Sequence, residues 1–129
     1  MTARVLAVDD IAANLRLLEA KLQAEYYEVL LASSGQEALA IAFTQLPDVI
    51  LLDVMMPGID GYETCTQLRK IQQYKKTPII MVSGKTSPLD EVKGVMAGCT
   101  TYLTKPVQPE AFQKLGARVL AWLERQQRQ

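Results

Sequence analysis

The sequence predicts an α/β fold, a single domain built on a doubly wound, five-stranded parallel sheet. Two patterns support this prediction. Short apolar segments alternate with amphipathic segments of helical periodicity along the 129 residues. The apolar segments are continuous, as is typical of parallel strands that are buried on both faces. Because connections between parallel strands are right-handed, the carboxyl ends of the strands should meet at one edge of the sheet.

The expected strands are short, apolar and rich in β-branched residues. The segments RVLAV and YEVLL form the first two. Pro47 precedes the third, Pro78 opens the fourth, and the last is the short segment TYL. The expected strands span residues 4–8, 27–31, 48–52, 79–82 and 101–103.

The expected helices lie between these strands and after the last one. In the first helix, leucines recur at helical spacing and polar residues lie away from that stripe. Ser34 can cap the second helix, with Glu37 three residues later for a capping box. Gly98 stands where a left-handed helix end is expected, and Pro109 lies near the first turn of the last helix. The expected helices span residues 11–26, 35–46, 62–71, 89–96 and 109–123.

Composition excludes several classes of protein. There are 14 acidic and 14 basic side chains, so no excess of positive charge suggests a nucleic-acid surface. No apolar run approaches the roughly 20 residues that span a bilayer, and the first residues lack the features of a secretory signal. Cys65 and Cys99 are too few for a disulfide framework. We therefore expect a cytoplasmic protein with no membrane contact.

The domain is expected to span residues 1–123, followed by a polar tail at 124–129. There is no internal repeat, low-complexity segment or linker before residue 124. The sequence leaves open whether this domain stands alone or belongs to a longer protein.

Polar and charged residues follow the apolar strands at the edge where ligands bind in open parallel sheets. Asp9 and Asp10 follow the first strand, Asp53 the third, Ser83 the fourth and Lys105 the fifth. The pattern predicts three carboxylates, one hydroxyl and one ammonium in a single crevice. Such a crevice suits a divalent cation and a phosphoryl group.

Crowded carboxylates repel one another, and a cation stabilises them. Mg²⁺ prefers oxygen ligands and retains some of its waters. Asp10 and Asp53 are the expected direct ligands, with Asp9 holding a coordinated water and the Met55 carbonyl supplying another oxygen. The Asp53 carboxylate could also attack phosphorus and form an aspartyl phosphate.

Four motifs carry a resemblance to a known family. The segments VDD (8–10), LDVMMPGIDG (52–61), SG (83–84) and TKP (104–106) resemble those of the receiver domain of two-component response regulators. The likeness covers roughly residues 4–123, and residues 5–32 look most like receivers of diguanylate-cyclase regulators. The resemblance implies a CheY-like, flavodoxin-like fold with strand order 2-1-3-4-5.

The same resemblance implies roles for individual residues. Asp53 would accept the phosphoryl group, Mg²⁺ would bind Asp10 and Asp53, and Asp9 would support it. Ser83 would be the switch hydroxyl, Tyr102 the switch aromatic, and Lys105 would contact the phosphoryl group. Histidine is not among the residues of the chain, and this chemistry does not require it.

The predicted function is a phosphorylation-dependent switch rather than a metabolic enzyme. A histidine kinase or histidine phosphotransfer protein would donate the phosphoryl group. Phosphorylation would reshape the face formed by the fourth helix, fifth strand and last helix. That face would control a downstream protein or a fused output domain. The sequence does not decide whether two copies of the chain form a homodimer through the same face.

Alternatives remain at this stage. Asp9 and Asp10 could merely cap the first helix, and Tyr102 could be an ordinary half-buried strand residue. A receiver-like interaction module that takes no phosphate would carry the same fold. A magnesium-dependent phosphohydrolase using an aspartyl phosphate is also conceivable, although such enzymes commonly carry a second aspartate where this chain has Met55. Nucleotide binding is disfavoured because neither a G-x-G-x-x-G nor a P-loop motif occurs.

Overall fold

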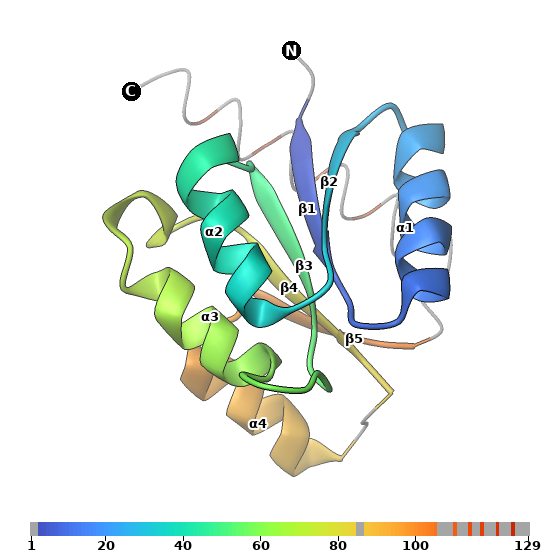
Figure 1. Cartoon of the computed structure of the whole chain (residues 1–129). Helices are drawn as coiled ribbons and strands as arrows, with labels where there is room; N and C mark the ends of the chain where they lie inside the picture. Colours follow the sequence, from blue (N-terminus) through green and yellow to red (C-terminus); the bar gives the residue numbers. More distant parts are fainter. Residues whose placement is uncertain are drawn as a thin grey trace.

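The computed structural model describes residues 3–84 and 87–105, together with positions 110, 114, 117, 121 and 125. Within them lies a five-stranded, wholly parallel sheet of order β2-β1-β3-β4-β5 (Figure 1). The predicted α/β fold, its strand order and its single domain are confirmed.

The strands lie where the sequence predicts them, with small differences at their ends. Asp53 and Ser83 were expected to follow their strands, but each is the last paired residue of its strand. Asp53 is paired with Val82, and Ser83 is paired with Thr104. The ladder therefore holds the backbone of both site residues. The strands are β1 (Arg4–Val8), β2 (Glu28–Ala32), β3 (Val49–Asp53), β4 (Ile79–Ser83) and β5 (Thr101–Thr104).

Four of the expected helices are present in the described ranges, and a short 3₁₀ helix, η1, was not predicted. They are α1 (Ala12–Ala24), α2 (Gly35–Gln45), α3 (Gly61–Arg69), η1 (Gln72–Tyr74) and α4 (Pro88–Ala97). The buried Tyr74 accounts for η1, since its hydroxyl donates to the Ala42 carbonyl of α2. The last expected helix (109–123) and the polar tail (124–129) lie outside the described residues except at single positions.

The helix ends follow ordinary capping chemistry with one difference. The Ser34 hydroxyl accepts from the Glu37 backbone N–H at 3.0 Å, as predicted. The Glu37 carboxylate, however, accepts from the Ser33 hydroxyl at 2.8 Å, so only half of the expected capping box forms. Ser87 caps α4, and Gly98 ends it with φ +97°, the left-handed conformation that glycine tolerates best.

Alternate residues of the buried strands face opposite layers. Leu6, Ile50 and Met81 point to the layer that contains α2 and α3. Val5 and Leu51 point to the layer that contains α1. This arrangement buries both faces of the sheet and places the connections from β1 to α1, β2 to α2, β3 to α3 and β4 to α4 at the same edge (Figure 1).

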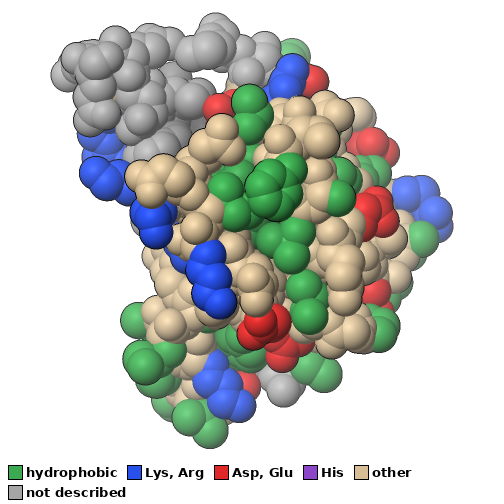
Figure 2. All heavy atoms as spheres, turned by 60° about the vertical axis from the view of Figure 1, so that its left-hand side comes forward, with side chains coloured by type: hydrophobic (Ala, Val, Ile, Leu, Met, Phe, Trp, Pro, Cys, Tyr) green, Lys and Arg blue, Asp and Glu red, His purple; other side chains and the backbone are tan. Residues whose placement is uncertain are grey.

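The surface features agree with the composition. On the face turned forward in Figure 2, hydrophobic side chains lie between separate basic and acidic ones, and both signs of charge occur. In the described part of the chain, no helix is long and apolar enough to cross a bilayer. Cys65 and Cys99 are both free thiols.

Candidate functional site

The sheet gathers the predicted residues at the carboxyl edge of its strands. The Asp9 backbone N–H donates to the Ala32 carbonyl at 3.1 Å, which continues the β1–β2 ladder by one residue. The Lys105 backbone N–H likewise donates to the Ser83 carbonyl at 2.8 Å, just beyond β5. Pairing across the strands therefore fixes the backbone from which each of these side chains projects.

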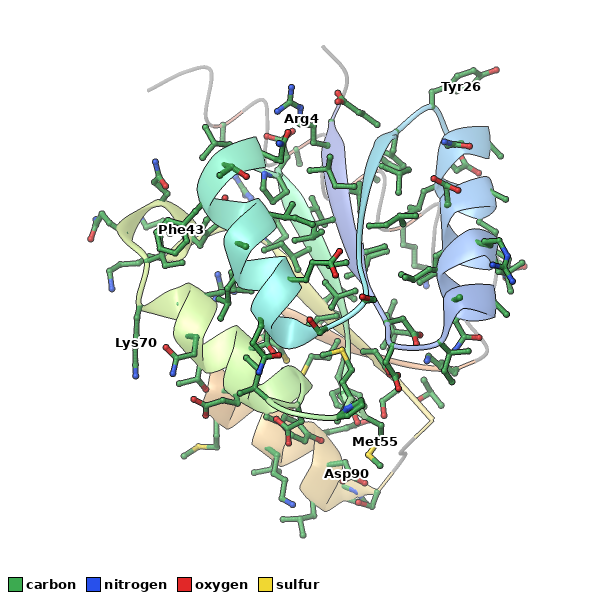
Figure 3. The ribbon with its side chains drawn as sticks, in the orientation of Figure 1. Arg4, Tyr26, Phe43, Met55, Lys70 and Asp90 are labelled. Atoms are coloured by element: carbon green, nitrogen blue, oxygen red, sulfur yellow. The ribbon has the colours of Figure 1, made fainter. Side chains whose placement is uncertain are left out.

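The loop between β3 and α3 shapes one side of the site. The Gly61 backbone N–H donates to the Val54 carbonyl at 2.9 Å and closes the loop. A Cβ at Gly61 would lie only 2.3 Å from the Asp53 carbonyl oxygen, so only glycine permits this approach of α3 to β3. Met55 projects from this loop with 57% of its surface exposed, at the same end of the molecule as Asp90 (Figure 3).

Three carboxylates meet in the site. One oxygen from each of Asp9, Asp10 and Asp53 lies within 4.8 Å of the others. Asp9 is fully buried and Asp53 is 7% exposed, whereas Asp10 is exposed. Among the described residues, no hydrogen-bond or salt-bridge partner of the Asp10 carboxylate is found, so its oxygens are available to a ligand.

The Lys105 ammonium bridges two of these carboxylates. Its Nζ atom lies 3.0 Å from Asp9 Oδ2 and 3.2 Å from Asp53 Oδ1. A single ammonium among three carboxylates leaves a formal charge of −2 when all four groups are ionised. This excess charge, carried by oxygen atoms, fits a divalent hard cation.

Burial and neighbouring charges perturb both partners of the central pair. Burial raises the pKa of the Asp53 carboxyl, the charge of Asp9 raises it further, and Lys105 lowers it by less. Burial alone would lower the pKa of Lys105, but the hydrogen bond to Asp9 and the charges of Asp53 and Asp9 raise it above its ordinary value. Asp53 is therefore a carboxylate whose charge the protein alone does not fully compensate.

The two expected switch residues lie on the adjacent strands β4 and β5, two positions apart in register, because Tyr102 is paired with Met81 and Ser83 with Thr104. Ser83 is fully buried and Tyr102 is half-buried. Tyr102 packs against α4, because a Cβ at Gly94 would lie 2.9 Å from its ring. The Tyr62 hydroxyl donates to the Asp90 carbonyl at 3.1 Å and also shares a hydrogen bond with Tyr102. Tyr62 thus links α3, α4 and β5.

Sequence reasoning missed one polar side chain of the site, Asn14. Its amide Nδ2 donates to Asp9 Oδ2 at 3.2 Å. The available signal was its position in the first turn of α1, which begins at the same edge of the sheet as Asp9. Asp9 does not cap α1 through the usual N-cap position, which Ile11 occupies; it accepts instead from the Ile11 backbone N–H at 2.9 Å.

Comparison with known proteins shows the family of this chain. A family model described as the response regulator receiver domain matches residues 5–117. The chain belongs to this family. The resemblance predicted from the sequence motifs is therefore confirmed.

Several curated proteins are similar to this chain. Response regulator PleD of Caulobacter vibrioides is 50% identical over 107 residues, which are 83% of this chain and 24% of PleD. The regulatory protein PhoP of Bacillus subtilis is 43% identical over 125 residues, 97% of this chain and 50% of PhoP. The chain thus spans a quarter to a half of these two relatives. Protein PilH of Pseudomonas aeruginosa is 39% identical over 119 residues, 92% of this chain and 98% of PilH.

Solved structures show the same fold. The chemotaxis protein CheY4 of Vibrio cholerae superposes with a TM-score of 0.87 at 42% identity, covering 92% of this chain and 99% of CheY4. A putative response regulator from Chloroflexus aurantiacus superposes with a TM-score of 0.88 at 36% identity, covering 94% of this chain. The receiver architecture is therefore shared over nearly the whole chain.

Proposed function

We propose that this receiver domain is a phosphorylation-dependent switch whose phosphoacceptor is Asp53. The observation that carries the proposal is the setting of that carboxylate. Asp53 lies 3.2 Å from the Lys105 ammonium, and the carboxylates of Asp9 and Asp10 lie beside it. A purely structural aspartate would gain nothing from two further carboxylates within 4.8 Å.

The proposed reaction is a direct phosphoryl transfer. A carboxylate oxygen of Asp53 attacks the phosphorus of a phosphohistidine, carried by a histidine kinase or a histidine phosphotransfer protein. The O–P bond forms as the N–P bond breaks, and the imidazole nitrogen keeps the electron pair. Lys105 would contact an oxygen of the transferred group, and Ser83 would donate its hydroxyl to another. The catalysis is positioning and charge neutralisation, so no histidine of this chain is needed.

The acidic cluster fits Mg²⁺. Asp10 and Asp53 would be direct ligands, Asp9 would hold a coordinated water, and the Met55 carbonyl would supply another oxygen. Bound Mg²⁺ would neutralise charge on the phosphoryl oxygens during transfer. Support comes from the donor set itself, which consists of hard oxygen atoms with an uncompensated negative charge.

Signalling would follow from the position of Ser83 and Tyr102. A phosphoryl group on Asp53 adds charge and acceptor oxygens one strand away from Ser83. If Ser83 moves toward it, Tyr102 can turn into the space that Ser83 leaves. Because Tyr102 packs against Gly94, its movement would change the packing of α4 against β5.

The output would be read on the face formed by α4, β5 and the last helix. In the described part of this face, α4 exposes four large apolar side chains. They are Leu89, Val92, Val95 and Met96. A downstream protein, a fused output domain or a second copy of the chain would bind there, in the cytoplasm. We propose residues 1–123 as the receiver domain and 124–129 as a polar tail that follows it.

The test is intact mass after incubation with acetyl phosphate and Mg²⁺. Wild type should gain one phosphoryl group, about 80 Da, and the gain should require Mg²⁺. Asp53→Asn should show no gain while remaining folded by circular dichroism. Wild type that binds Mg²⁺ but gains no mass would instead support an interaction module that takes no phosphate.

A further inference from the structure

Asn14 makes a contact with the site that the proposed roles do not use. The Asp9 carboxylate is fully buried and, within the described residues, accepts from three donors. The Ile11 backbone N–H bonds Oδ1 at 2.9 Å. Asn14 Nδ2 and Lys105 Nζ both bond Oδ2, at 3.2 Å and 3.0 Å. The amide and the ammonium therefore share one oxygen of a buried carboxylate.

This shared oxygen is important because the Lys105 ammonium bonds a second carboxylate, that of Asp53, as well as Asp9. Its Nζ atom is almost as close to Asp53 as to Asp9, at 3.2 Å and 3.0 Å. If Lys105 turns to a phosphoryl group on Asp53, Asp9 Oδ2 loses its charged donor. A buried acceptor that loses its partner carries a desolvation cost. Of the side chains that the structure describes, Asn14 is the donor that would still bond Asp9 Oδ2, because it belongs to α1 and does not depend on Lys105.

The same contact anchors the start of α1. Its N-cap residue, Ile11, offers no side-chain cap. Asp9 holds this end through the Ile11 backbone and, three residues further, through the Asn14 side chain. The carboxylate is therefore fixed from one helix by two donors, independently of the ammonium that reaches it from beyond β5.

We propose that Asn14 is a positioning residue for the phosphoryl-transfer site. It holds Asp9 Oδ2 in place, so that Asp9 stays oriented toward the cation while Lys105 moves to the phosphoryl group. The movement of Lys105 rests on the proposed function. The hold of Asn14 on Asp9 does not, and it should already affect binding of the cation alone.

The first test measures Mg²⁺ binding by calorimetry without any phosphodonor. Asn14→Leu keeps the size of the side chain but removes the donor, and should weaken Mg²⁺ binding about tenfold, the low end for losing an outer-shell hydrogen bond. Asn14→Gln keeps the amide and should stay within about threefold of wild type. Gln23→Leu is the matched control, because Gln23 is an exposed amide on the same helix, and its affinity should equal that of wild type.

The second test measures the rate of phosphorylation by acetyl phosphate at saturating Mg²⁺. Asn14→Leu should still be slower by about tenfold, because saturating the cation does not restore the donor to Asp9. Melting curves in EDTA would show whether the variants are folded. A merely structural role would lower the melting temperature and leave Mg²⁺ affinity and the saturated rate unchanged.

The outcomes separate the two proposals. Equal Mg²⁺ affinity in wild type and Asn14→Leu would overturn the role of Asn14, and so would equal weakening in the leucine and glutamine variants. Wild type that binds Mg²⁺ but is never phosphorylated would remove the proposed function, while the calorimetric comparison would still decide whether Asn14 positions Asp9. Wild type that binds no Mg²⁺ would overturn both.

Discussion

At the scale of single residues, the Asp53 carboxylate opposes the stability of the metal-free protein. Its pKa is raised by burial and by the charge of Asp9, despite the nearby Lys105. A raised pKa in the folded state means that the ionised carboxylate is less favourable there than in the unfolded chain. The stability linked to Asp53 is therefore present at low pH and lost as pH rises through its folded-state pKa. At neutral pH, Asp53 destabilises the metal-free protein.

We therefore expect Asp53→Asn to stabilise the metal-free protein. At neutral pH in EDTA, the midpoint of thermal unfolding should rise by roughly a few degrees, because the neutral amide avoids the cost of burying a charge and relieves the repulsion with Asp9. The difference should shrink as pH falls, since wild type then becomes neutral at the same position. Calorimetry or circular dichroism across pH would measure this. Glu91→Gln is the control, because Glu91 is an exposed carboxylate in the first turn of α4, where the helix dipole favours a negative charge; this variant should not raise the midpoint.

The sequence predicts some residues of the site and not others. Asp9, Asp10, Asp53, Ser83 and Lys105 could be predicted because each follows or ends an apolar strand, where a polar side chain is unusual. Asn14 could not, because an asparagine in the first turn of a helix is ordinary. Its role depends on a contact with Asp9 that exists only once β1 and α1 are folded.

At the scale of elements, Arg69 binds the C-terminal end of α4, which lies away from the site. Its guanidinium donates to the Gly98 carbonyl at 2.8 Å, just past α4, and to Thr100 Oγ1 at 3.3 Å, just before β5. It also donates to the carbonyls of Tyr74 and Thr77 at 2.7 Å and 2.6 Å. One side chain at the end of α3 therefore joins α4, η1, and the approaches to β4 and β5.

Replacing Arg69 with methionine should destabilise the fold. The loss should be about 2–3 kcal/mol, because several carbonyls lose a charged donor and are only partly accessible to water. Arg69→Lys should recover part of this, since a single ammonium cannot reproduce the planar fork of donors. Urea unfolding would measure both variants. Arg16→Met, at an exposed position on α1, is the matched control and should change stability by less than about 0.5 kcal/mol.

An Arg69→Met variant as stable as the control would show that water replaces the guanidinium without loss of stability.

Elements also differ in how well the sequence predicts them. The strands and the first four helices could be predicted from apolar periodicity and capping residues. The helix η1 could not, since its three residues are polar or aromatic in sequence and are held by a hydroxyl contact of Tyr74 with α2.

At the scale of the whole molecule, topology creates the site. The cluster unites residues that are far apart in sequence: Lys105 is 96 residues from Asp9 and 52 from Asp53. Parallel pairing brings these positions to one edge, which is why motif spacing alone could predict the set of residues. Motif spacing could not predict that the Lys105 ammonium contacts both Asp9 and Asp53, because those contacts depend on side-chain geometry within the folded crevice.

The described part of the molecule is also unevenly packed. Every residue of β3 and β4 is buried, as are four of the five residues of β1. No residue of β5 is fully buried, and Gly94 is the single buried residue of α4. Elements that bury few side chains open at lower free energy than the rest of the fold. The side of the sheet that carries Tyr102 should therefore be the more mobile one.

Amide hydrogen exchange should reveal this difference. We expect the amides of α4 and β5 to exchange at least about a hundredfold faster than those of β1, β3 and β4, corresponding to local opening at roughly 3 kcal/mol less than the central strands require. Exchange followed by mass spectrometry or NMR on the metal-free protein would measure it. β2 is an internal reference, because it is also an outer strand but has a buried terminal residue and packs against both α1 and α2. It should therefore exchange more slowly than β5. Equal protection of β5 and the central strands would mean that α4 and β5 open only with the whole sheet, and a switch that moves them would then have to act against the full stability of the domain.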